Sequence, residues 1–344
     1  MRYAPVIIPT LNRYEHFKNC LESLEACVGA EYTDVHIGLD YPPEEKYIEG
    51  WRLIDNYLFE KERNNRFHAL IVYRRKENYL LSGKGNAKTI VNRLKKKEES
   101  YILSEDDNIF SPNFLIFMNT CLEKYKNNPD IVCVTGYSYP IDWITKEGAT
   151  VQIQNFNASS WGRAWWSHKK TYIDTVFAEE KMYYEADEDI KKLRYKRLIN
   201  ASLIEYVAYI IGSGQKLMKC SSDVGMRAYI GISDKYVVSP IVSLVCNKGF
   251  DGSGLYCQDN YSKTLDNTEA LSYDYNNQPI DVRNYFDIVE NDPAFLEENR
   301  RKLNDFDRRS IKQVFKAKMI LILVHLFGLQ VIRFLYSKYR DFLN

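Results

Sequence analysis

The sequence lacks the cysteine pattern of a disulfide-stapled or zinc-bound protein. Its seven cysteines are odd in number and dispersed, and no two form a C-x-x-C pair. A structural zinc site and an oxidising compartment are therefore disfavoured, and a reducing compartment is expected. The first residues, MRYAPVIIPTLNR, also lack an apolar core of signal-peptide length. We therefore expect a cytoplasmic protein in which a strand begins the fold at once.

A strong net charge and a bilayer-length apolar run are also missing. The chain has 47 Lys and Arg against 46 Asp and Glu, a net charge of +1, so no global field would attract nucleic acid. The apolar run at 319–332 is about 14 residues long, shorter than the roughly 20 that a spanning helix needs. Positive charge is concentrated at 300–344, which carries eleven Lys or Arg and three Asp.

The C-terminal apolar run leaves two interpretations, a buried core helix and a helix lying in a membrane interface. Cationic residues flank the run on both sides and favour the interface; they are Lys312, Lys316, Lys318, Arg333, Lys338 and Arg340. We expect 310–344 to form a basic amphipathic helix at the inner face of the cell membrane.

Strand and helix patterns alternate through the first part of the chain. Short apolar runs indicate strands at 4–8, 35–39, 70–73, 101–103 and 131–135, and helical spacing of apolar residues indicates helices at 17–28, 48–58, 86–94 and 114–125. This order predicts an α/β fold with a mainly parallel, Rossmann-like sheet flanked by helices.

Polar clusters follow three of the expected strands. They are Asn12-Arg13, Asp40 and Glu105-Asp106-Asp107. Ligands of such sheets bind outside the carboxyl ends of the strands, so we expect all three clusters to line one crevice.

The acidic cluster in YILSEDDNIF allows two interpretations. It could be an ordinary acidic loop before a helix capped by Ser111-Pro112. It could instead hold Mg²⁺ or Mn²⁺, which prefer carboxylate oxygens and neutralise phosphate charge. Its place after a sheet strand favours the metal site. We expect Asp107 to bind the metal and Asp106 to lie near a ribose, whereas Glu105 would not contact the ligand directly.

The stretch LLSGKGNAKT (80–89) does not have the spacing of a Walker phosphate loop. A turn leading into a helix remains, and its N–H groups with Lys84 could meet a phosphate or a sugar. A plain glycine turn with a solvated Lys84 explains the stretch equally well.

Five motifs together resemble nucleotide-sugar glycosyltransferases of the GT-A fold. They occur in the family's order: APVIIPTLNR, GLD at 38–40, SEDD, SSWGRAWW, and DVGMR followed by SLVCNKGFDGSG. The likeness covers about residues 1–260 and is of the bacterial surface-polysaccharide type. It is also distantly similar to N-acetylglucosaminyltransferase I, whose acidic motif is of the E-D-D kind.

The resemblance implies a nucleotide site made by Pro9, Thr10, Asn12, Arg13, Asp40 and Asp106, to which we add Lys84. It implies Asp107 as the ligand of Mn²⁺ or Mg²⁺, and Trp161 and Gly162 as part of a wall around the acceptor and donor sugar. Gly252 belongs to a glycine-rich loop that could fold over the donor. A core position is the alternative for Trp161, because aromatic side chains mostly pack.

The resemblance also implies that Asp223 is the general base and Arg227 its partner. An inverting transfer needs a carboxylate that takes the proton of the acceptor hydroxyl. The alternative for Asp223 is a helix N-cap. A rival acidic group at 185–189 (Glu185, Asp187, Glu188 and Asp189) is explained more simply as a solvated helix start.

One departure from the family concerns the metal. Relatives often have a His soon after the GFDGSG stretch, where this chain has Leu255, Tyr256 and Cys257. If the His is replaced in this chain, the metal would bind more weakly, or a water would take the place of the His.

We therefore expect a GT-A domain at 1–260, with a nucleotide-binding half at 1–137 and an acceptor and catalytic half at 138–260. A polar connection at 261–309 would lead to the membrane-associating helix at 310–344. The expected activity is transfer of a sugar, with inversion, from a UDP-sugar to a glycan or lipid-linked glycan. The alternatives are a nucleotidyltransferase, which normally has a glycine-rich loop after its first strand, and a non-catalytic nucleotide- or glycan-binding relative.

Overall fold

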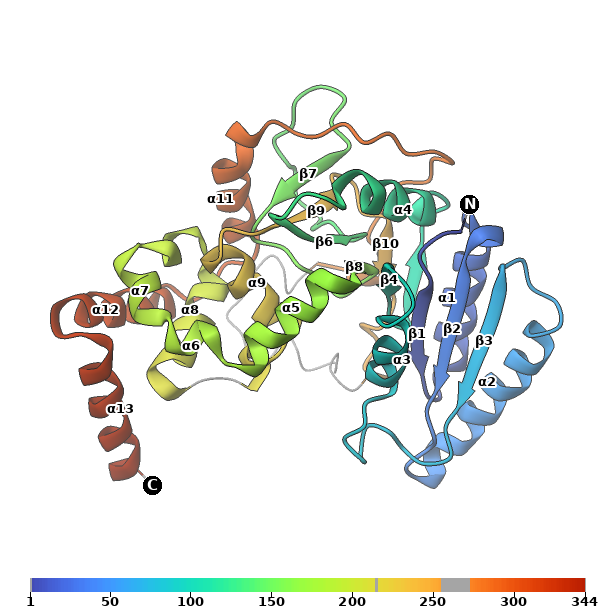
Figure 1. The fold of residues 1–344 in the computed structure, drawn as a ribbon, viewed down its shortest axis with the longest axis horizontal. Coiled ribbons are helices and arrows are strands. Elements are labelled where there is room, and N and C mark those ends of the chain that lie inside the picture. Colours follow the sequence, from blue (N-terminus) through green and yellow to red (C-terminus); the bar gives the residue numbers. More distant parts are fainter. Residues whose placement is uncertain (1, 214–215, 255–272, 344) are drawn as a thin grey trace.

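A computed structural model of the chain describes residues 2–213, 216–254 and 273–343. Its centre is an eight-stranded sheet in the order β3-β2-β1-β4-β8-β6-β9-β7, with helices packed on it (Figure 1). A second, two-stranded sheet pairs β10 with β5. The predicted fold class, a mainly parallel α/β sheet flanked by helices with a C-terminal helical extension, is confirmed.

The first four sheet strands run parallel and their order places β1 in the middle. β1 pairs with β2 on one side and β4 on the other, and β2 pairs with β3. The elements of this part are β1 (Val6–Thr10), α1 (Tyr14–Glu25), β2 (Asp34–Leu39), α2 (Ile48–Lys61), β3 (Ala69–Arg74), α3 (Asn86–Leu94) and β4 (Ser100–Leu103).

The second half of the sheet is joined to the first by one antiparallel strand, β8, which lies between β4 and β6. β6 and β9 are parallel, and β7 is antiparallel to β9 at the sheet's end. The elements here are β5 (Asn108–Phe110), α4 (Phe114–Tyr125), β6 (Ile131–Thr135), β7 (Val151–Gln154), β8 (Arg163–Trp166), α5 (Ser167–Ala178), α6 (Lys181–Tyr184), α7 (Ala186–Lys191), α8 (Asn200–Ala208), α9 (Asp223–Ile232), β9 (Tyr236–Pro240) and β10 (Val245–Asn247).

Strand β1 shows how the sheet is buried on both faces. Ile7 packs in a cluster with side chains of α3, α5, α8 and α9, whereas Val6 and Ile8 pack in a cluster with side chains of α1, α2 and α4. All three are fully buried, and such burial stabilises the fold by about 1.5–3 kcal/mol per side chain. This double coverage explains why the strand is a continuous apolar run.

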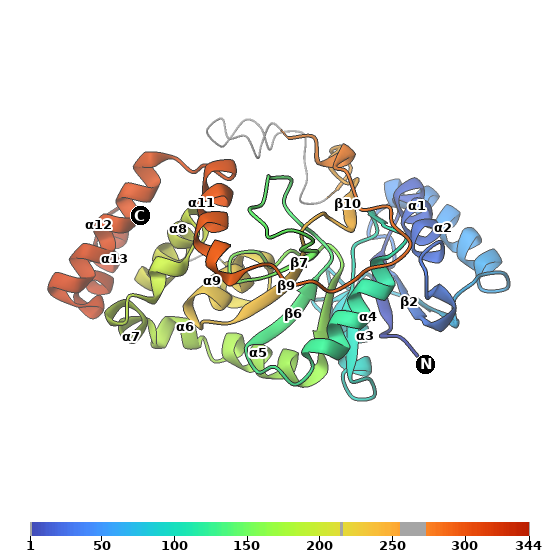
Figure 2. The same cartoon turned by 90° about the horizontal axis from the view of Figure 1, so that it is seen from above.

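The segment predicted as a polar surface connection contains more structure than its composition indicates. It forms helix α11 (Leu296–Phe306), whose Leu303 and Phe306 are buried. Before that helix the chain crosses the sheet close to β7 (Figure 2), where Asn291 donates a backbone hydrogen bond to Val151. The side chains of Asn291 and Asn299 also accept the backbone N–H groups of Lys146 and Ile144, so these two polar residues fix the segment to the fold.

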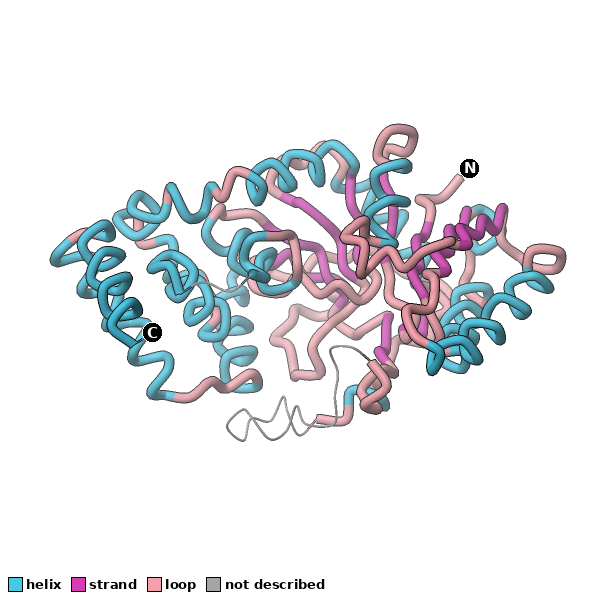
Figure 3. Tube along the Cα trace, turned by 90° about the horizontal axis from the view of Figure 1, so that it is seen from below, coloured by secondary structure: helices cyan, strands magenta, loops and turns pink. Residues whose placement is uncertain are grey.

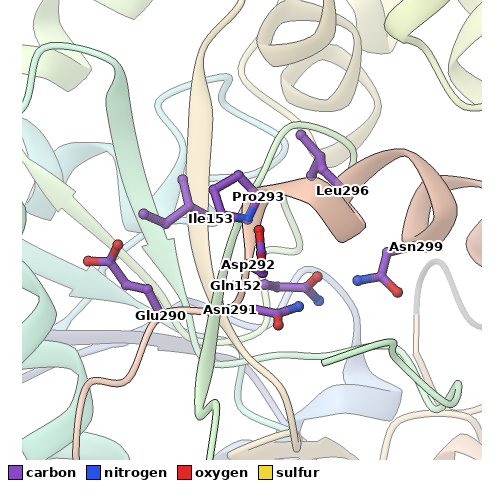
Figure 4. A pocket seen from close by; sticks show the side chains of 8 residues that line it. All are labelled: Gln152, Ile153, Glu290, Asn291, Asp292, Pro293, Leu296 and Asn299. Carbon is purple, nitrogen blue, oxygen red and sulfur yellow. The ribbon is translucent and has the colours of Figure 1, made fainter. Parts of the chain in front are cut away.

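A small pocket lies in the seam between β7 and this crossing segment (Figure 4). It encloses about 40 Å³ and is lined by Gln152, Ile153, Glu290, Asn291, Asp292, Pro293, Leu296 and Asn299. Asn291 and Asn299 both bind the backbone of Ile144. A volume of this size holds a few waters rather than a nucleotide-sugar, and none of the predicted site residues lines it.

The predicted C-terminal helix is divided into two, α12 (Ile311–Phe327) and α13 (Leu329–Leu343) (Figure 3). The division falls at Gly328, whose φ of 83° is a conformation that suits glycine. The pair lies at the opposite end of the molecule from α1 and α2 (Figure 1). No helix in the described ranges combines the length and apolarity needed to cross a bilayer.

We predict that His36 makes the fold sensitive to mild acid. Burial, together with the positive charges of Arg93 and Arg2, lowers the pKa of His36 to about 4, against about 6.5 in an unfolded chain. The unfolded chain therefore binds this proton more readily, and the free energy of unfolding falls as the pH drops from about 6.5 towards 4. Between pH 7.5 and pH 5, we expect His36 to lower the free energy of unfolding by about 2 kcal/mol.

Urea unfolding of the wild type and of His36→Gln at both pH values measures the effect. On acidification, the free energy of unfolding of the variant should fall by about 2 kcal/mol less than that of the wild type. An equal loss in both proteins would mean that His36 does not carry this dependence.

Candidate functional site

The carboxyl ends of three parallel strands meet at one edge of the sheet, as predicted. Thr10 ends β1, Leu39 ends β2, and Leu103 ends β4. The backbone N–H of Asp40 donates to the carbonyl of Thr10 at 2.9 Å, and the Thr10 hydroxyl donates to Asp106 Oδ2 at 2.8 Å. The polar clusters that follow the three strands are thus joined through β1.

Asp106 is held from two sides by residues at the end of β1. Its Oδ2 accepts the Thr10 hydroxyl, and its Oδ1 pairs with the guanidinium of Arg13, the residue that precedes α1. The Asp106 side chain is only 10% exposed. Both oxygens of this buried carboxylate therefore have donors before any ligand binds.

Asp107 is held between the same arginine and the end of β10. Arg13 approaches Asp107 Oδ2 at 2.9 Å, and the Asn247 amide donates to Oδ1 at 2.7 Å. The pairing of β10 with β5 places Asn247 opposite Asn108, the residue after Asp107. Gly249 lies so close that a Cβ there would stand 2.1 Å from Asp107 Oδ2, which explains the need for glycine at this point.

Burial and mutual repulsion set the charges of the acidic cluster. Burial, and next the charge of Asp107, raises the pKa of Glu105 to about 7. Burial also raises the pKa of Asp106, although Arg13 opposes the shift. Burial alone would lower the pKa of Arg13, but Asp106 and Asp107 outweigh it and raise that pKa above its ordinary value. The guanidinium therefore stays charged and neutralises part of the cluster.

Asp223 lies in the same region because Ser160 connects it to the acidic cluster. The Ser160 N–H donates to Asp223 Oδ2 at 2.9 Å, and the Ser160 hydroxyl donates to Glu105 Oε1 at the same distance. The other Asp223 oxygen is 3.3 Å from an Arg163 nitrogen. Asp223 begins α9, but Ser222 is the residue that caps it. Its carboxylate is therefore engaged by Ser160 and Arg163 rather than by the end of its own helix.

Arg227, the predicted partner of Asp223, lies one turn further along α9 among other groups. Tyr139, Glu205 and Asp307 are the groups whose charges raise its pKa most, against the effect of burial, and Asp223 contributes less. The Arg227 Nε has no hydrogen-bond partner in the part of the chain that the structure describes. Among the described residues, the cation paired with Asp223 is Arg163.

The other predicted nucleotide residues lie around the ends of β1 and β2. Pro9 is half-buried in β1 and Asn12 is half-buried in the loop after it. Asp40 is buried, and its Oδ1 accepts the N–H groups of Tyr41 and Tyr79. Lys84 is paired with Glu77 and lies over the Tyr79 ring, so the structure places it on the Asp40 side and shows no contact with the acidic cluster.

The predicted sugar wall divides into three different settings. Trp161 is half-buried and meets the rings of Tyr137, Phe250 and Tyr275 edge-on. Gly162 is buried at the start of β8, with a φ of 64°. Gly252 is exposed in a turn beside Asp251, and Asp251 Oδ2 is 2.8 Å from His16 Nε2 of α1. Trp161 thus belongs to an aromatic cluster next to Ser160.

The rival acidic group is a helix start, as its simpler interpretation predicted, but the prediction that the group is solvated is wrong for Asp189. Helix α7 begins at Ala186, and Asp187 and Glu188 pair with lysines one turn later. Asp189 is buried and pairs with Arg194 at 2.8 Å. The position of the expected His, at Leu255, Tyr256 and Cys257, lies outside the described residues.

Sequence reasoning missed the residues that connect the site. Ser160 and Arg163 were inside a recognised motif, SSWGRAWW, and Asn247 and Gly249 were inside another. Their roles depend on contacts with residues far away in the chain, at Asp223, Glu105 and Asp107. Local pattern carries no signal for such contacts.

We predict that Gly162→Ala will destabilise the protein by about 2–4 kcal/mol, because a positive φ and a steric clash add together. A Cβ at Gly162 would stand 2.7 Å from a Phe114 ring carbon and 3.1 Å from Val245. Gly148→Ala is the matched control, since Gly148 has a φ of 72° but no atom within 4 Å of the added carbon.

Urea unfolding should show a loss of about 1 kcal/mol for the control, from backbone strain alone. Equal losses in the two variants would contradict the packing of Gly162 against Phe114 and Val245.

Comparisons with known proteins return distant structural likenesses. No protein-family model matches the chain, and no curated protein matches its sequence. The solved structure of S. aureus TarS 1-349 matches with a TM-score of 0.34 and 14% identity, over 53% of this chain and 50% of that chain. The structure of S. aureus TarS 1-349 in complex with UDP-GlcNAc matches with a TM-score of 0.34 and 15% identity, over 53% of this chain and 48% of that chain. A longer S. aureus TarS structure matches with a TM-score of 0.36 and 14% identity, over 71% of this chain and 35% of that chain. These values are too low to assign a family.

Proposed function

We propose that the protein is a glycosyltransferase that moves a sugar from a UDP-sugar to a glycan or lipid-linked glycan, with inversion at the anomeric carbon. The observation that carries the proposal is the Ser160 link. It joins a candidate proton acceptor, Asp223, to an acidic cluster at the carboxyl edge of a parallel sheet. A nucleotide-sugar at that edge would present its diphosphate to the acids and its sugar to Asp223.

Asp223 supplies the base that such a transfer needs. Its carboxylate takes the proton of the acceptor hydroxyl while that oxygen forms a bond to the anomeric carbon, and the bond from that carbon to the diphosphate breaks. Ser160 and Arg163 hold both Asp223 oxygens, so the carboxylate is oriented before the acceptor binds.

The acidic cluster offers hard oxygen donors, the ligands that a divalent cation prefers. Asp107 would hold Mn²⁺ or Mg²⁺, with Asp106 beside it. Bound there, the ion supplies positive charge to the departing diphosphate. In residues 2–213, 216–254 and 273–343, no three His, Cys, Asp or Glu side chains form a group that could hold a metal. One or two carboxylates are nevertheless the usual protein share for Mg²⁺ on a nucleotide, because phosphates and water complete the shell.

The nucleoside would lie over the ends of β1 and β2. Pro9, Thr10 and Asn12 border that position, and Asp40 pins the loop that carries Tyr79 and Lys84. Half-buried Trp161, next to Ser160, offers an aromatic surface for a sugar ring. This division leaves the acceptor on the side of Asp223.

The direct test is incubation with Mn²⁺ and a panel of UDP- and GDP-sugars. Slow release of UDP without an acceptor supports the transferase. Exchange of pyrophosphate into nucleotide would instead support a nucleotidyltransferase, and binding without turnover would support a non-catalytic relative.

We predict that Asp223→Asn will lower the rate of sugar transfer by about 10²–10⁴-fold, because the amide cannot accept the proton. UDP binding in the presence of Mn²⁺ should change by less than about twofold, since Asp223 acts on the acceptor. Asp187→Asn is the matched control, because it also removes an ion-paired carboxylate in the first turn of a helix. Near-normal transfer by Asp223→Asn would place the base elsewhere.

We also propose that the face formed by α12 and α13 binds an anionic membrane surface from the cytoplasmic side. Large apolar side chains are exposed along both helices; they are Ile311, Phe315, Met319, Ile322, Leu323, Leu326, Phe327, Val331, Phe334, Leu335 and Tyr339. Exposed cations accompany them at Lys312, Lys316, Lys318 and Lys338. Apolar side chains beside lysines suit the boundary of lipid headgroups and acyl chains.

Two features refine the earlier expectation of one amphipathic helix. The opposite side of α12 is anchored in the core by Ala317, Leu321 and Val324. Arg333, predicted as a membrane-facing cation, instead donates to the carbonyls of Ile210 and Tyr183. The helices are therefore part of the fold, so removing them would test folding as well as membrane binding.

A triple variant tests the surface without removing the helices. Phe315→Ser, Leu326→Ser and Phe334→Ser change side chains that are 64%, 69% and 59% exposed. Flotation with vesicles containing about 30% phosphatidylglycerol should show at least a fivefold loss of bound protein, because apolar area and charge act together. The control is Phe59→Ser, Leu81→Ser and Val282→Ser, which are 54%, 74% and 73% exposed elsewhere.

The membrane proposal would be overturned if the wild-type protein did not bind the vesicles but sedimented as a dimer, and if the triple variant sedimented as a monomer. Equal flotation of the triple variant and its control would overturn it as well.

A further inference from the structure

The guanidinium of Arg13 occupies the place between the two acids where a bridging cation would sit. One nitrogen, Nη2, contacts both Asp106 Oδ1 and Asp107 Oδ2. The three side chains are largely buried, with 18% of Arg13, 10% of Asp106 and 8% of Asp107 exposed. A divalent cation could not coordinate both of these oxygens while Arg13 stays in place.

Each acid also has a second donor that does not depend on Arg13. Asp106 Oδ2 accepts the Thr10 hydroxyl at 2.8 Å, and Asp107 Oδ1 accepts the Asn247 amide at 2.7 Å. Thr10 lies in β1 and Asn247 in β10, so both donors belong to strands. The two carboxylates would therefore keep their orientation after Arg13 moved away, which leaves a preorganised pair of oxygens for a metal.

The arrangement of charge shows that Arg13 alone does not make a diphosphate site. Two carboxylates and one guanidinium leave the cluster negative, and a diphosphate would be repelled. A divalent cation on the acids reverses the sign of the site. It also frees a guanidinium, whose planar donors suit phosphate oxygens.

Arg13 is placed so that it can move without rearranging the fold. It is the residue before the first turn of α1, and its side chain makes no capping hydrogen bond to that helix. Its backbone carbonyl accepts the N–H of Phe17, and this bond would persist whichever way the side chain points.

We propose that Arg13 is a resident counter-ion of the acidic pair, which a divalent cation displaces, and that the released guanidinium then binds the diphosphate of the nucleotide. The second step rests on the proposed function, whereas the displacement does not. The consequence is that metal and nucleotide bind cooperatively, each favouring the state that the other needs.

The displacement is tested with Mn²⁺ alone, by electron paramagnetic resonance of the free ion, on the full chain without nucleotide. Arg13→Gln removes the competing charge, and Mn²⁺ should bind at least about tenfold more tightly than to the wild type. Arg74→Gln is the matched control, because Arg74 also bridges two acids, Asp55 and Glu62, at the surface. It should leave Mn²⁺ affinity unchanged.

Mn²⁺ binding to Arg13→Gln that is equal to or weaker than wild type would overturn the proposal. Should that variant fail to fold, Arg13→Met provides the same test, because its unbranched side chain fills similar space without a positive charge. Its Mn²⁺ affinity should lie above that of the wild type, and an unchanged or lower affinity would also overturn the displacement.

The second step is measured as coupling between Mn²⁺ and UDP. In the wild type, saturating UDP should tighten Mn²⁺ binding, and in Arg13→Gln this enhancement should fall at least about fivefold. An undiminished enhancement would overturn the transfer of Arg13 to the diphosphate. A protein that binds no UDP at all contradicts the proposed function, and the experiment with Mn²⁺ alone still decides the displacement.

Discussion

The parallel pairing of β1 with β2 and β4 is the constraint on which the site depends. Because the three strands run in one direction, their carboxyl ends and the residues that follow them share one edge of the sheet. Thr10 and Arg13 reach Asp106 from the end of β1, and Asp40 is bonded to Thr10 from the end of β2. The pairing in turn requires burial of both sheet faces, which the alternation of Val6, Ile7 and Ile8 provides. A buried sheet thus brings three charged residues, Arg13, Asp40 and Asp106, together at its rim.

The negative charge at this rim is partly compensated by the chain's own arginines, and this has a functional meaning. The acids are partly desolvated, which is costly unless a cation is near, and Arg13 provides that cation within the chain itself. On the other side of Ser160, Arg163 does the same for Asp223. Arg13 thus serves the pair Asp106 and Asp107, and Arg163 serves Asp223. The fold therefore compensates part of this negative charge without a ligand.

Much of the fold and part of the site could be predicted from the sequence, for reasons that differ between elements. The bounds of α3, α4 and β6 agree with their predicted ranges. These bounds depend on the spacing of apolar residues and on the turn residues beside them, which are both visible in the local sequence. Helix α11 was missed because its two buried apolar side chains, Leu303 and Phe306, lie in an otherwise polar segment. The division at Gly328 was missed because the apolar run continues through it. Ser160 and Asn247 could not be assigned, since their partners lie far along the chain and only folding brings them close.

The single antiparallel strand in the middle of the sheet has a consequence for where functional residues can come from. β8 runs against β4 and β6, so its first residue, Arg163, pairs with Leu103 and Thr135, the last residues of those strands. The chain that enters β8 therefore crosses the same rim that the chain leaving β4 and β6 crosses. Ser160 reaches Glu105 and Asp223 from this incoming side. Reversing one strand allows the fold to supply its rim from both directions of the chain, so residues before a strand carry as much chemical interest here as residues after one.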